Sequence, residues 1–524
     1  MPQWFQATEL SQHMTRLVLI RADASQRIGS GHVMRCLTLA DALRARGRTI
    51  EFVCRTQPGN FVDIVRERGY TVHALEDAED YVRHGWLGIS VARDVQETLK
   101  VLAGRRAEWL IVDHYGISVE WETQLAPHVD KLMAIDDMAD RDHICHLLLD
   151  QNFSRQASKR YAEHVSPACT QLLGPRYALL RDEFALARAE LRPRDGRVRR
   201  VLVFFGGSDP DNLTGKVISA MAGPEFDGVA LDVVLGAANP HRNSIAEQLC
   251  GRQNARLMVQ VDNMADLMAA ADLAVGAGGG TTWERMCMGL PTVVVTIAEN
   301  QVPAIRDLQA LGLLRWAGDV CHMDQPSLRV QIADAVADPE TNRWQSTQGM
   351  QLVDGHGASH VADLLCGLGE SKTWNLRRAK AEDRALYWHW VNDPLVRASA
   401  IHTAQIPWEN HCRWFDNTLA CPNKWLFVAE GAMGPLGQVR FERSVDEITI
   451  HYSVAAQFRG QGRATILLEQ AMEQLKVLVG QDACLHATVR IHNEASARVF
   501  QRLGFAEGAI ENAGLRIFRR RLGG

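Results

Sequence analysis

The sequence has 524 residues, which is room for three or four domains of about 150 residues each. Apolar residues make up 46% and charged residues 23%, and the net charge of −5 comes without a block of basic residues, so neither nucleic acid nor a membrane surface is an expected partner. Eleven cysteines without a CxxC pair favour reduced thiols in a cytoplasmic protein. No apolar run is long enough to predict a membrane span.

No metal site is predicted. His143, Cys145 and His146 lie close together, but they belong to a stretch that is typical of the entry to a buried strand. A stable zinc site needs a full set of well-spaced ligands. Residues 1–15 are expected to be an extension before the first strand, and both Met1 and Met14 remain open as the natural start.

Short apolar runs alternate with helical stretches through the first two thirds of the chain. Continuous apolar runs separated by helices are typical of parallel sheets covered on both faces. We therefore expect an α/β fold with two doubly wound domains, residues 16–190 and 191–368, and a cleft between them. A charged, helical connection is expected over residues 161–199. The expected strands are 17–23, 50–55, 109–115, 131–137 and 146–152, followed by 200–209, 230–236, 255–261, 273–280 and 291–300.

The pattern changes near residue 372. Strands that read as antiparallel follow, and then a Gly-rich turn, a long helix and another strand. This order predicts a C-terminal α+β domain over residues 373–524. Its expected strands are 425–430, 437–443, 447–454 and 484–489.

Gly-rich turns follow three of the expected strands. Gly29, Gly31 and His32 come directly before a strongly helical stretch. Glycines let a backbone turn sharply and approach a ligand, the start of a helix attracts phosphate, and a histidine titrates near neutral pH. A tight turn with a surface histidine fits the spacing equally well. The other two turns are Gly206, Gly207 and Ser208, and Gly278, Gly279 and Gly280 with Thr281 and Thr282, for which a plain helix-packing turn is the alternative.

The whole stretch from Arg21 to Cys36 closely resembles the opening of the UDP-sugar hydrolases of pseudaminic acid biosynthesis, which remove UDP from a 2,4-diacetamido-2,4,6-trideoxy altrose. The resemblance covers about residues 16–365, with its motifs in the same order. It continues through 113–115, 136–137, 150–152, 173–177, 206–210 and 278–284.

This resemblance implies a GT-B-like pair of domains with His32 as the catalytic residue. It also implies that the second domain binds UDP, with Glu284 on the ribose hydroxyls. Asn300 and Gln301 match the family too, although a polar loop ending a strand is the alternative. The expected substrate-binding residues are Gly29, Gly31, Arg35, Tyr115, Gly206, Gly207, Ser208, Gly278, Gly279, Gly280, Thr281, Thr282, Glu284, Asn300 and Gln301.

The chemistry expected of such a hydrolase is a single displacement with inversion. UDP is a good leaving group, so the enzyme has to activate water, neutralise the diphosphate and exclude other acceptors. A histidine is a suitable base at neutral pH. Asp23 or Asp113 is expected to orient His32, although both also fit the role of a structural aspartate at a strand end.

A further Gly-rich turn follows the strand that ends at Val454. It resembles the coenzyme A signature of the GNAT acetyltransferases, in which backbone N–H groups hold the pyrophosphate. The segment from Asn493 to Phe505 resembles a later part of the same family, with Asn493 and Ser496 facing the cofactor. An unrelated α+β module is the alternative. Acetyl-CoA is therefore the expected co-substrate, with contacts from Val454, Gln457, Arg459, Gly460, Gln461, Gly462, Arg463, Ala464, Asn493 and Ser496.

Residues 390–397 and 408–415 resemble, more loosely, an acetyltransferase that acts on UDP-4-amino sugars. Its acceptor pocket would use Trp390, Asp393, Arg397 and His411, although helix packing also explains the tryptophans. Many GNAT members have a tyrosine at the position of Phe500 that protonates the leaving thiolate, which implies another donor such as Tyr452. The candidates for the general base, acting through a water, are His451, Glu442 and His486.

Three classes of function follow from these features. The first is a bifunctional enzyme that N-acetylates a UDP-linked amino sugar and then hydrolyses the product. The second is a GT-B glycosyltransferase fused to an acetyltransferase, because one fold supports both transfer and hydrolysis. The third is a UDP-sugar sensor joined to a protein N-acetyltransferase. Which diamino-sugar stereoisomer is used, and the oligomeric state, are not readable from the sequence.

Overall fold

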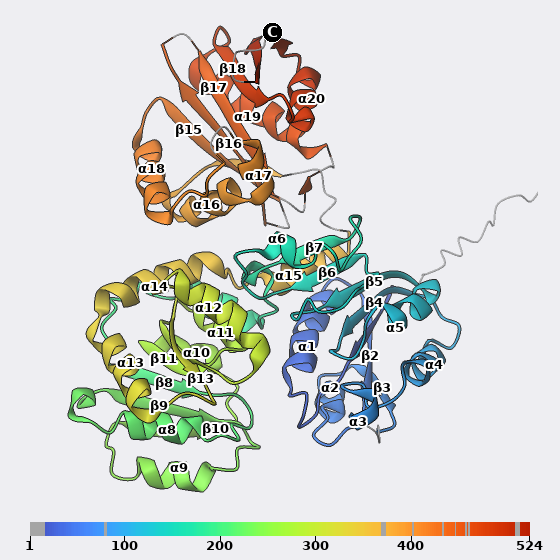
Figure 1. The fold of residues 1–524 in the computed structure, drawn as a ribbon, viewed down its shortest axis with the longest axis vertical. Coiled ribbons are helices and arrows are strands. Elements are labelled where there is room, and N and C mark those ends of the chain that lie inside the picture. The colour runs from blue at the N-terminus through green and yellow to red at the C-terminus, as the bar shows by residue number, and fades with distance from the viewer. Residues whose placement is uncertain are drawn as a thin grey trace, which may run out of the picture. The chain divides into compact units, whose positions relative to one another are not determined.

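The computed structural model describes residues 16–523, apart from 78–80, 368–373, 401–402, 432–433, 446, 456–457, 460–461 and 509–513. These residues form three sheets (Figure 1). Two compact units are resolved, one of residues 1–150 and 160–171 and one of residues 151–159 and 172–524. Among the described residues, no helix combines the length and the apolar character needed to cross a membrane.

The first sheet has seven strands in the order β3-β2-β1-β4-β5-β6-β7, and the pairs from β3 to β6 are parallel. Every residue of the central strand β1 is buried, which explains its continuous apolar run. The strands are β1 (Leu17–Ala22), β2 (Thr49–Arg55), β3 (Thr71–Leu75), β4 (Ala107–Asp113), β5 (Val129–Ile135), β6 (Leu147–Asp150) and β7 (Thr170–Leu173). The helices of this part are α1 (Gly31–Arg44), α2 (Val62–Glu67), α3 (Tyr81–His84), α4 (Val91–Leu102), α5 (Val119–Leu125) and α6 (Ala157–Arg160).

The second sheet has six parallel strands in the order β10-β9-β8-β11-β12-β13. Apolar side chains on both faces of this sheet form two separate core clusters. The strands are β8 (Arg200–Phe204), β9 (Ala230–Leu235), β10 (Ala255–Val259), β11 (Leu273–Ala277), β12 (Thr292–Thr296) and β13 (Arg315–Asp319). The helices are α7 (Asp182–Ala189), α8 (Leu213–Ala220), α9 (Arg242–Leu249), α10 (Met264–Ala270), α11 (Thr281–Cys287), α12 (Val302–Ala310), α13 (Gln325–Ala337), α14 (Pro339–Leu352) and α15 (Gly357–Leu365).

The third sheet is mixed, in the order β14-β15-β16-β17-β18-β20-β19, and its one described parallel pair is β17 with β18. One large apolar cluster forms its core. The strands are β14 (Asn375–Arg378), β15 (Lys424–Gly431), β16 (Gly434–Arg443), β17 (Ile448–Val454), β18 (Cys484–Arg490), β19 (Ala506–Glu507) and β20 (Leu515–Arg521). The helices are α16 (Arg384–Asn392), α17 (Pro394–Ser399), α18 (Trp408–Ala420), α19 (Arg463–Val479) and α20 (Glu494–Arg502).

The sheets confirm the predicted fold class of two parallel α/β sheets followed by an α+β domain. The helical connection predicted over residues 161–199 is wrong in its first half, because this segment contains strand β7 and becomes helical over α7. The predicted domain boundaries and the predicted cleft stay predictions, and the N-terminal extension 1–15 lies outside the described residues.

Candidate functional sites

The first candidate site lies where the strand order of the first sheet reverses direction. Strands β1 and β4 pair there in parallel, and Ala22 at the end of β1 lies opposite Asp113 at the end of β4. Ligands of open α/β sheets bind outside the carboxyl ends of the strands at such a point. The turn after β1 contains Gly29, whose φ of +82° favours glycine, and it leads into α1 with His32 in the first turn.

His32 and Asp113 form a buried pair at this edge. The Nδ1 of His32 lies 2.6 Å from Oδ1 of Asp113, and the two side chains are 6% and 0% exposed. An ionised carboxylate accepts a hydrogen bond, so Nδ1 carries the proton and Nε2 is left as the basic nitrogen. No hydrogen-bond partner of Nε2 occurs among the described residues. The imidazole is therefore oriented as a general base requires.

Arg35, one turn further along α1, holds the other side of the same carboxylate. Its Nε and Nη2 donate to the two oxygens of Asp113 at 2.6 and 2.7 Å. Burial opposes the charge of Asp113, but Arg35 and His32 together hold its pKa well below the usual value. Asp113 is therefore ionised at neutral pH. In this structure the guanidinium of Arg35 is bound to Asp113. Its predicted contact with substrate stays a prediction.

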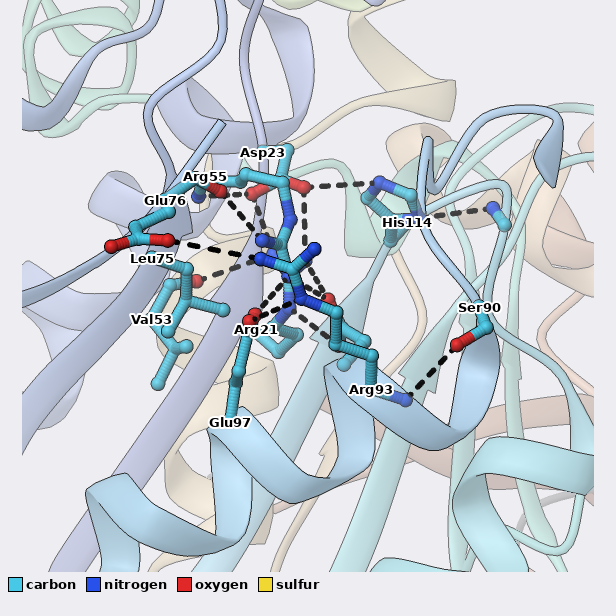
Figure 2. A network of polar contacts seen from close by, with 12 residues as sticks. Arg21, Asp23, Val53, Arg55, Leu75, Glu76, Ser90, Arg93, Glu97 and His114 are labelled. Carbon is cyan, nitrogen blue, oxygen red and sulfur yellow. Dashed lines mark hydrogen bonds and ion pairs between the residues drawn. The ribbon is translucent and has the colours of Figure 1, made fainter. Parts of the chain in front are cut away.

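Asp23, the other aspartate expected beside His32, belongs to a different network (Figure 2). Its carboxylate accepts from Arg21 at 2.5 and 3.0 Å and from the backbone N–H of Arg55 at 2.7 Å. Arg21 and Arg55 also donate to Asp94 of α4, and all four side chains are buried. These bonds hold Asp23 in a buried network, and Asp113 is the aspartate bonded to His32. The role expected for each aspartate in orienting His32 stays a prediction.

The segment after β4 connects the network around Asp23 to the His32 pair. His114 lies with Nε2 3.2 Å from Asp23, and its Nδ1 accepts from the backbone N–H of Gly116 at 3.0 Å. The ring of Tyr115 packs edge-on against His32, with centroids 4.5 Å apart. His114 was not among the site residues predicted from the sequence, although its two neighbours, Asp113 and Tyr115, were.

The second candidate site lies at the corresponding point of the second sheet. Strands β8 and β11 are neighbours, and Phe204 at the end of β8 lies opposite Gly276 near the end of β11. The turns Gly206–Ser208 and Gly278–Gly280 therefore leave the same edge of the sheet. Gly206 has a φ of +94°, which favours glycine.

Arg285 organises the second of these turns and was missed in the sequence. Its guanidinium donates to the hydroxyl oxygens of Thr281 and Thr282 at 3.2 and 3.1 Å and to the carbonyl of Ala277 at 2.6 Å. Burial lowers the pKa of Arg285 to about 10, which still leaves it charged at neutral pH. Because both threonine hydroxyls accept from Arg285, each keeps its own proton for a further hydrogen bond. The sequence signal for this contact was the helical spacing, because Thr282 and Thr281 lie three and four residues before Arg285.

Glu284 lies just before Arg285 on the same helix, α11. Its side chain forms no hydrogen bond or ion pair in the described part of the chain. Burial raises its pKa and the nearby Glu183 adds to this, against Arg181 and Arg285. An uncompensated carboxylate of this kind gains from two hydroxyl donors such as those of a ribose.

Gln301 lies at the end of a short 3-10 helix (Glu299–Gln301) beside the glycines of the second turn. A Cβ placed on Gly278 would lie 2.9 Å from Cγ1 of Ile305 and 3.2 Å from the side-chain oxygen of Gln301, so a larger residue here requires a shift. The same oxygen accepts from the backbone N–H of Ile297 at 3.0 Å. Gln301 therefore supports the turn, while its predicted contact with substrate, and that of Asn300, stay predictions.

The third candidate site lies in the C-terminal sheet, where β17 and β18 separate. They pair only at their first residues, Ile448 with Leu485 and Thr449 with His486. Further along, the Tyr452 hydroxyl lies 2.9 Å from the Ser496 hydroxyl of α20, and Asn493 caps this helix by accepting from the Ser496 N–H. The two residues expected to face the cofactor are thus next to the predicted proton donor.

The Gly-rich turn of this site is described in part. Gln457, Gly460 and Gln461 lie outside the described residues. Gly462 is the N-cap of α19 with a φ of +73°, and a Cβ there would have no neighbour within 4 Å among the described residues. Arg459 reaches back to the carbonyl of Val454 at 2.9 Å. An opening between strands, followed by an uncrowded glycine at a helix start, fits a coenzyme A pyrophosphate.

Arg463 and Ala464 start α19. The guanidinium of Arg463 lies over the ring of Phe458, 4.8 Å from its centroid. Both predicted contacts with acetyl-CoA stay predictions.

The residues proposed for the acceptor pocket have different environments. Trp390 and His411 are 7% and 1% exposed, and His411 Nε2 lies 2.9 Å from the carbonyl of Arg384, so helix packing explains both. Asp393 instead pairs with Arg459 at 3.0 Å, a residue of the Gly-rich turn.

Arg397, the fourth proposed pocket residue, donates from Nη1 to the carbonyl of Ala404 at 3.3 Å. Of the base candidates, Glu442 is paired with Lys424 and Arg440 at 2.9 and 2.7 Å. His451 lies opposite Arg440 and His486 lies beside Thr449.

Phe500, which stands where a tyrosine was expected, is 2% exposed and packs edge-on against Tyr452 with centroids 5.8 Å apart. Tyr452 thus places a hydroxyl group next to the ring of Phe500, which has none.

Comparisons with known proteins agree with this division of the chain. The glycosyltransferase family 28 C-terminal domain matches residues 201–305, and the acetyltransferase (GNAT) domain matches residues 374–506. An uncharacterized protein of Methanocaldococcus jannaschii is 23% identical over 511 residues, which are 93% of this chain and 96% of the relative.

Two further relatives each match a part of the chain. The spore coat polysaccharide biosynthesis protein SpsG of Bacillus subtilis is 24% identical over 67% of this chain and 98% of its own. The UDP-2,4-diacetamido-2,4,6-trideoxy-beta-L-altropyranose hydrolase of Campylobacter jejuni is 26% identical over 54% of this chain and 93% of its own. The chain therefore joins a glycosyltransferase-like part, similar to a UDP-sugar hydrolase, to a GNAT acetyltransferase domain, which confirms the resemblance seen in the sequence.

Proposed function

We propose that the protein is a bifunctional enzyme of pseudaminic acid-type sugar biosynthesis. Its C-terminal domain N-acetylates the 4-amino group of a UDP-linked amino sugar with acetyl-CoA. Its first part then hydrolyses the UDP-2,4-diacetamido-2,4,6-trideoxy-beta-L-altropyranose that results. The observation that carries the proposal is the 2.6 Å pair of His32 and Asp113 at the switch point of the first sheet, in a chain similar to such a hydrolase.

In the hydrolysis, His32 removes a proton from water through Nε2. The water oxygen bonds to the anomeric carbon on the face opposite UDP while the bond from that carbon to the diphosphate oxygen breaks, so the configuration inverts. Asp113 stabilises the imidazolium that forms, because its carboxylate accepts the hydrogen bond from Nδ1–H throughout. The hydroxyls of Thr281 and Thr282 and the turn Gly278–Gly280 neutralise the departing diphosphate, and Glu284 binds the ribose.

In the acetyl transfer, bound acetyl-CoA supplies the thioester carbonyl that the amine attacks. The turn that ends at Gly462 holds its pyrophosphate, and Asn493 positions Ser496 through its cap. Tyr452, paired with Ser496 at 2.9 Å, donates the proton that the leaving thiolate needs, because Phe500 has no hydroxyl. Asp393 lies near the same turn through Arg459 and is the candidate contact for the amine.

A glycosyltransferase is the second candidate for the first part of the chain. The match to the glycosyltransferase family 28 C-terminal domain favours it. Release of free sugar without any added acceptor separates hydrolysis from transfer, and a UDP-sugar sensor would release no UDP at all.

The proposal is tested with the purified protein and the acetylated UDP-diacetamido sugar, without acceptor or acetyl-CoA. We expect stoichiometric UDP and free sugar, with the inverted anomer appearing first by NMR. His32→Asn should slow this reaction roughly 10²–10⁴-fold while UDP still binds. A loss of less than about tenfold would remove His32 as the base, and formation of UDP only in the presence of an acceptor would establish transfer instead.

A further inference from the structure

An aromatic row leads outward from His32 along the first domain. Tyr115 packs against His32, and Trp86 packs against Tyr115 with ring centroids 5.5 Å apart. The guanidinium of Arg27 then lies over the rings of Trp86 and Tyr81, 4.9 and 5.6 Å from their centroids. Arg27 belongs to the same turn as Gly29 and His32, between β1 and α1. The row therefore ends in a cation that lies five residues before His32 in the sequence.

The segment that contains Trp86 is firmly attached to the segment after β4. A Cβ on Gly116 would lie 2.8 Å from the backbone nitrogen of Leu87, so the two backbones touch where glycine is required. Leu87 and Ile89 are buried, and α4 begins just after them at Val91.

Helix α4 is itself fixed by the buried network of Figure 2. Asp94 accepts from Arg21, Arg55 and the indole of Trp121, and all of these side chains are buried. Trp86 therefore has a rigid support, which reduces the conformational entropy lost when a ligand meets it.

The partners of Arg27 differ from those of two other arginines at this edge of the sheet. Arg21 is neutralised by Asp23 and Asp94, and Arg35 by Asp113. Arg27 is exposed, and its partners within the described part of the chain are aromatic rings rather than carboxylates. A guanidinium whose face is covered by rings keeps the N–H groups at its edge available to an incoming anion, and its planar fork suits phosphate oxygens.

We propose that Arg27, held by Trp86 and Tyr81, binds the diphosphate of the nucleotide sugar beside His32. Arg27 is then a further substrate-binding residue for the hydrolysis, and Trp86 is its positioning residue. The inference rests on the proposed nucleotide-sugar substrate but concerns binding, so it can be measured without turnover.

The test is calorimetric titration of the full-length protein and its variants with UDP, with uridine and with inorganic pyrophosphate. Arg27→Gln should weaken UDP and pyrophosphate binding roughly tenfold, as expected for the loss of a charge-assisted hydrogen bond, and leave uridine binding unchanged. Arg66→Gln, which removes the same charge from an exposed site on α2, is the matched control and should bind all three like the wild type.

Trp86→Phe should retain UDP affinity, whereas Trp86→Leu should lose about as much as Arg27→Gln, because only an aromatic ring stacks the guanidinium. With the acetylated UDP-sugar, both weakened variants should raise KM more than they lower kcat.

Equal UDP affinity of Arg27→Gln and the wild type, an equal loss in Arg66→Gln, or a matching loss of uridine binding would each overturn the proposal. Weaker UDP binding by Arg27→Gln in a protein that releases no UDP from the sugar would preserve the phosphate site and refute the hydrolase instead.

Discussion

Replacing Asp113 by asparagine tests whether this carboxylate orients the base His32 or only stabilises the fold. The carboxylate accepts three short hydrogen bonds, one from His32 at 2.6 Å and two from Arg35 at 2.6 and 2.7 Å. Asparagine offers one acceptor oxygen and turns an N–H group toward one of these donors. Breaking a buried ion pair costs about 3–5 kcal/mol, and we expect the lower end because Asp137 remains 3.5 Å from Arg35.

The catalytic effect of the same change is measured separately from its structural effect. Without the carboxylate, the Nδ1 proton of His32 is no longer fixed and the imidazolium is not stabilised, so kcat should fall roughly 10²–10⁴-fold, or about 3–5 kcal/mol of activation free energy. Release of UDP from the acetylated sugar measures the rate. Hydrogen exchange of peptides from β1 and β4 measures the local stability.

Asp232→Asn provides the matched control for Asp113→Asn. Asp232 is also fully buried and paired with two arginines, Arg200 and Arg256, but it lies on β9 of the second sheet and has no histidine partner in the described part of the chain. Its replacement should increase exchange in β9 and leave kcat within about twofold. If Asp113→Asn increases exchange in β4 but lowers kcat by less than tenfold, Asp113 is a structural residue and the reasoning about the base is refuted.

Three further changes test other parts of the account. Glu284→Gln should weaken UDP binding by roughly 1–3 kcal/mol in calorimetry, and an unchanged affinity would remove Glu284 from the site. Gly462→Trp should abolish acetyl-CoA binding and spare UDP release from the acetylated sugar. Gly480→Trp, at the other end of α19 with a φ of +83° and a ψ of 177°, should carry at least as much backbone strain and still bind acetyl-CoA; equal binding by both variants would place the cofactor elsewhere. Burial lowers the pKa of His114, against the charge of Asp23, so the unfolded chain takes up a proton below about pH 6.5 that the folded chain does not. Urea unfolding between pH 7.5 and 5 should therefore show the wild type losing up to about 1.4 kcal/mol per pH unit more than His114→Asn, and parallel curves would contradict a neutral buried imidazole.

The sequence predicts the central strands of each sheet well and its edges poorly. Strands such as β1 and β11 are buried on both faces, and this produces the apolar runs from which they were predicted. Strands β3 and β13 lie at sheet edges and β20 near one, and the sequences TVHAL, RWAGD and LRIFRRR are only partly apolar because one face meets solvent. The fold class was therefore predictable, while the full strand count was not.

The candidate site shows the same limit in another form. The turn with Gly29 and His32 was recognisable because its residues are adjacent in the chain. Its partner Asp113 is 81 residues away, and the sequence could not choose between it and Asp23. That choice depends on β4 lying beside β1 and on Arg21 and Arg55 occupying Asp23, which only the folded structure shows.

The most direct test of the account is a single incubation of the protein with acetyl-CoA and the UDP-4-amino sugar precursor, followed by mass spectrometry. The account predicts UDP, coenzyme A and free 2,4-diacetamido sugar, with the acetylated UDP-sugar appearing first. Free sugar that still has its 4-amino group, or an acetylated UDP-sugar that accumulates without loss of UDP, would contradict acetylation followed by hydrolysis.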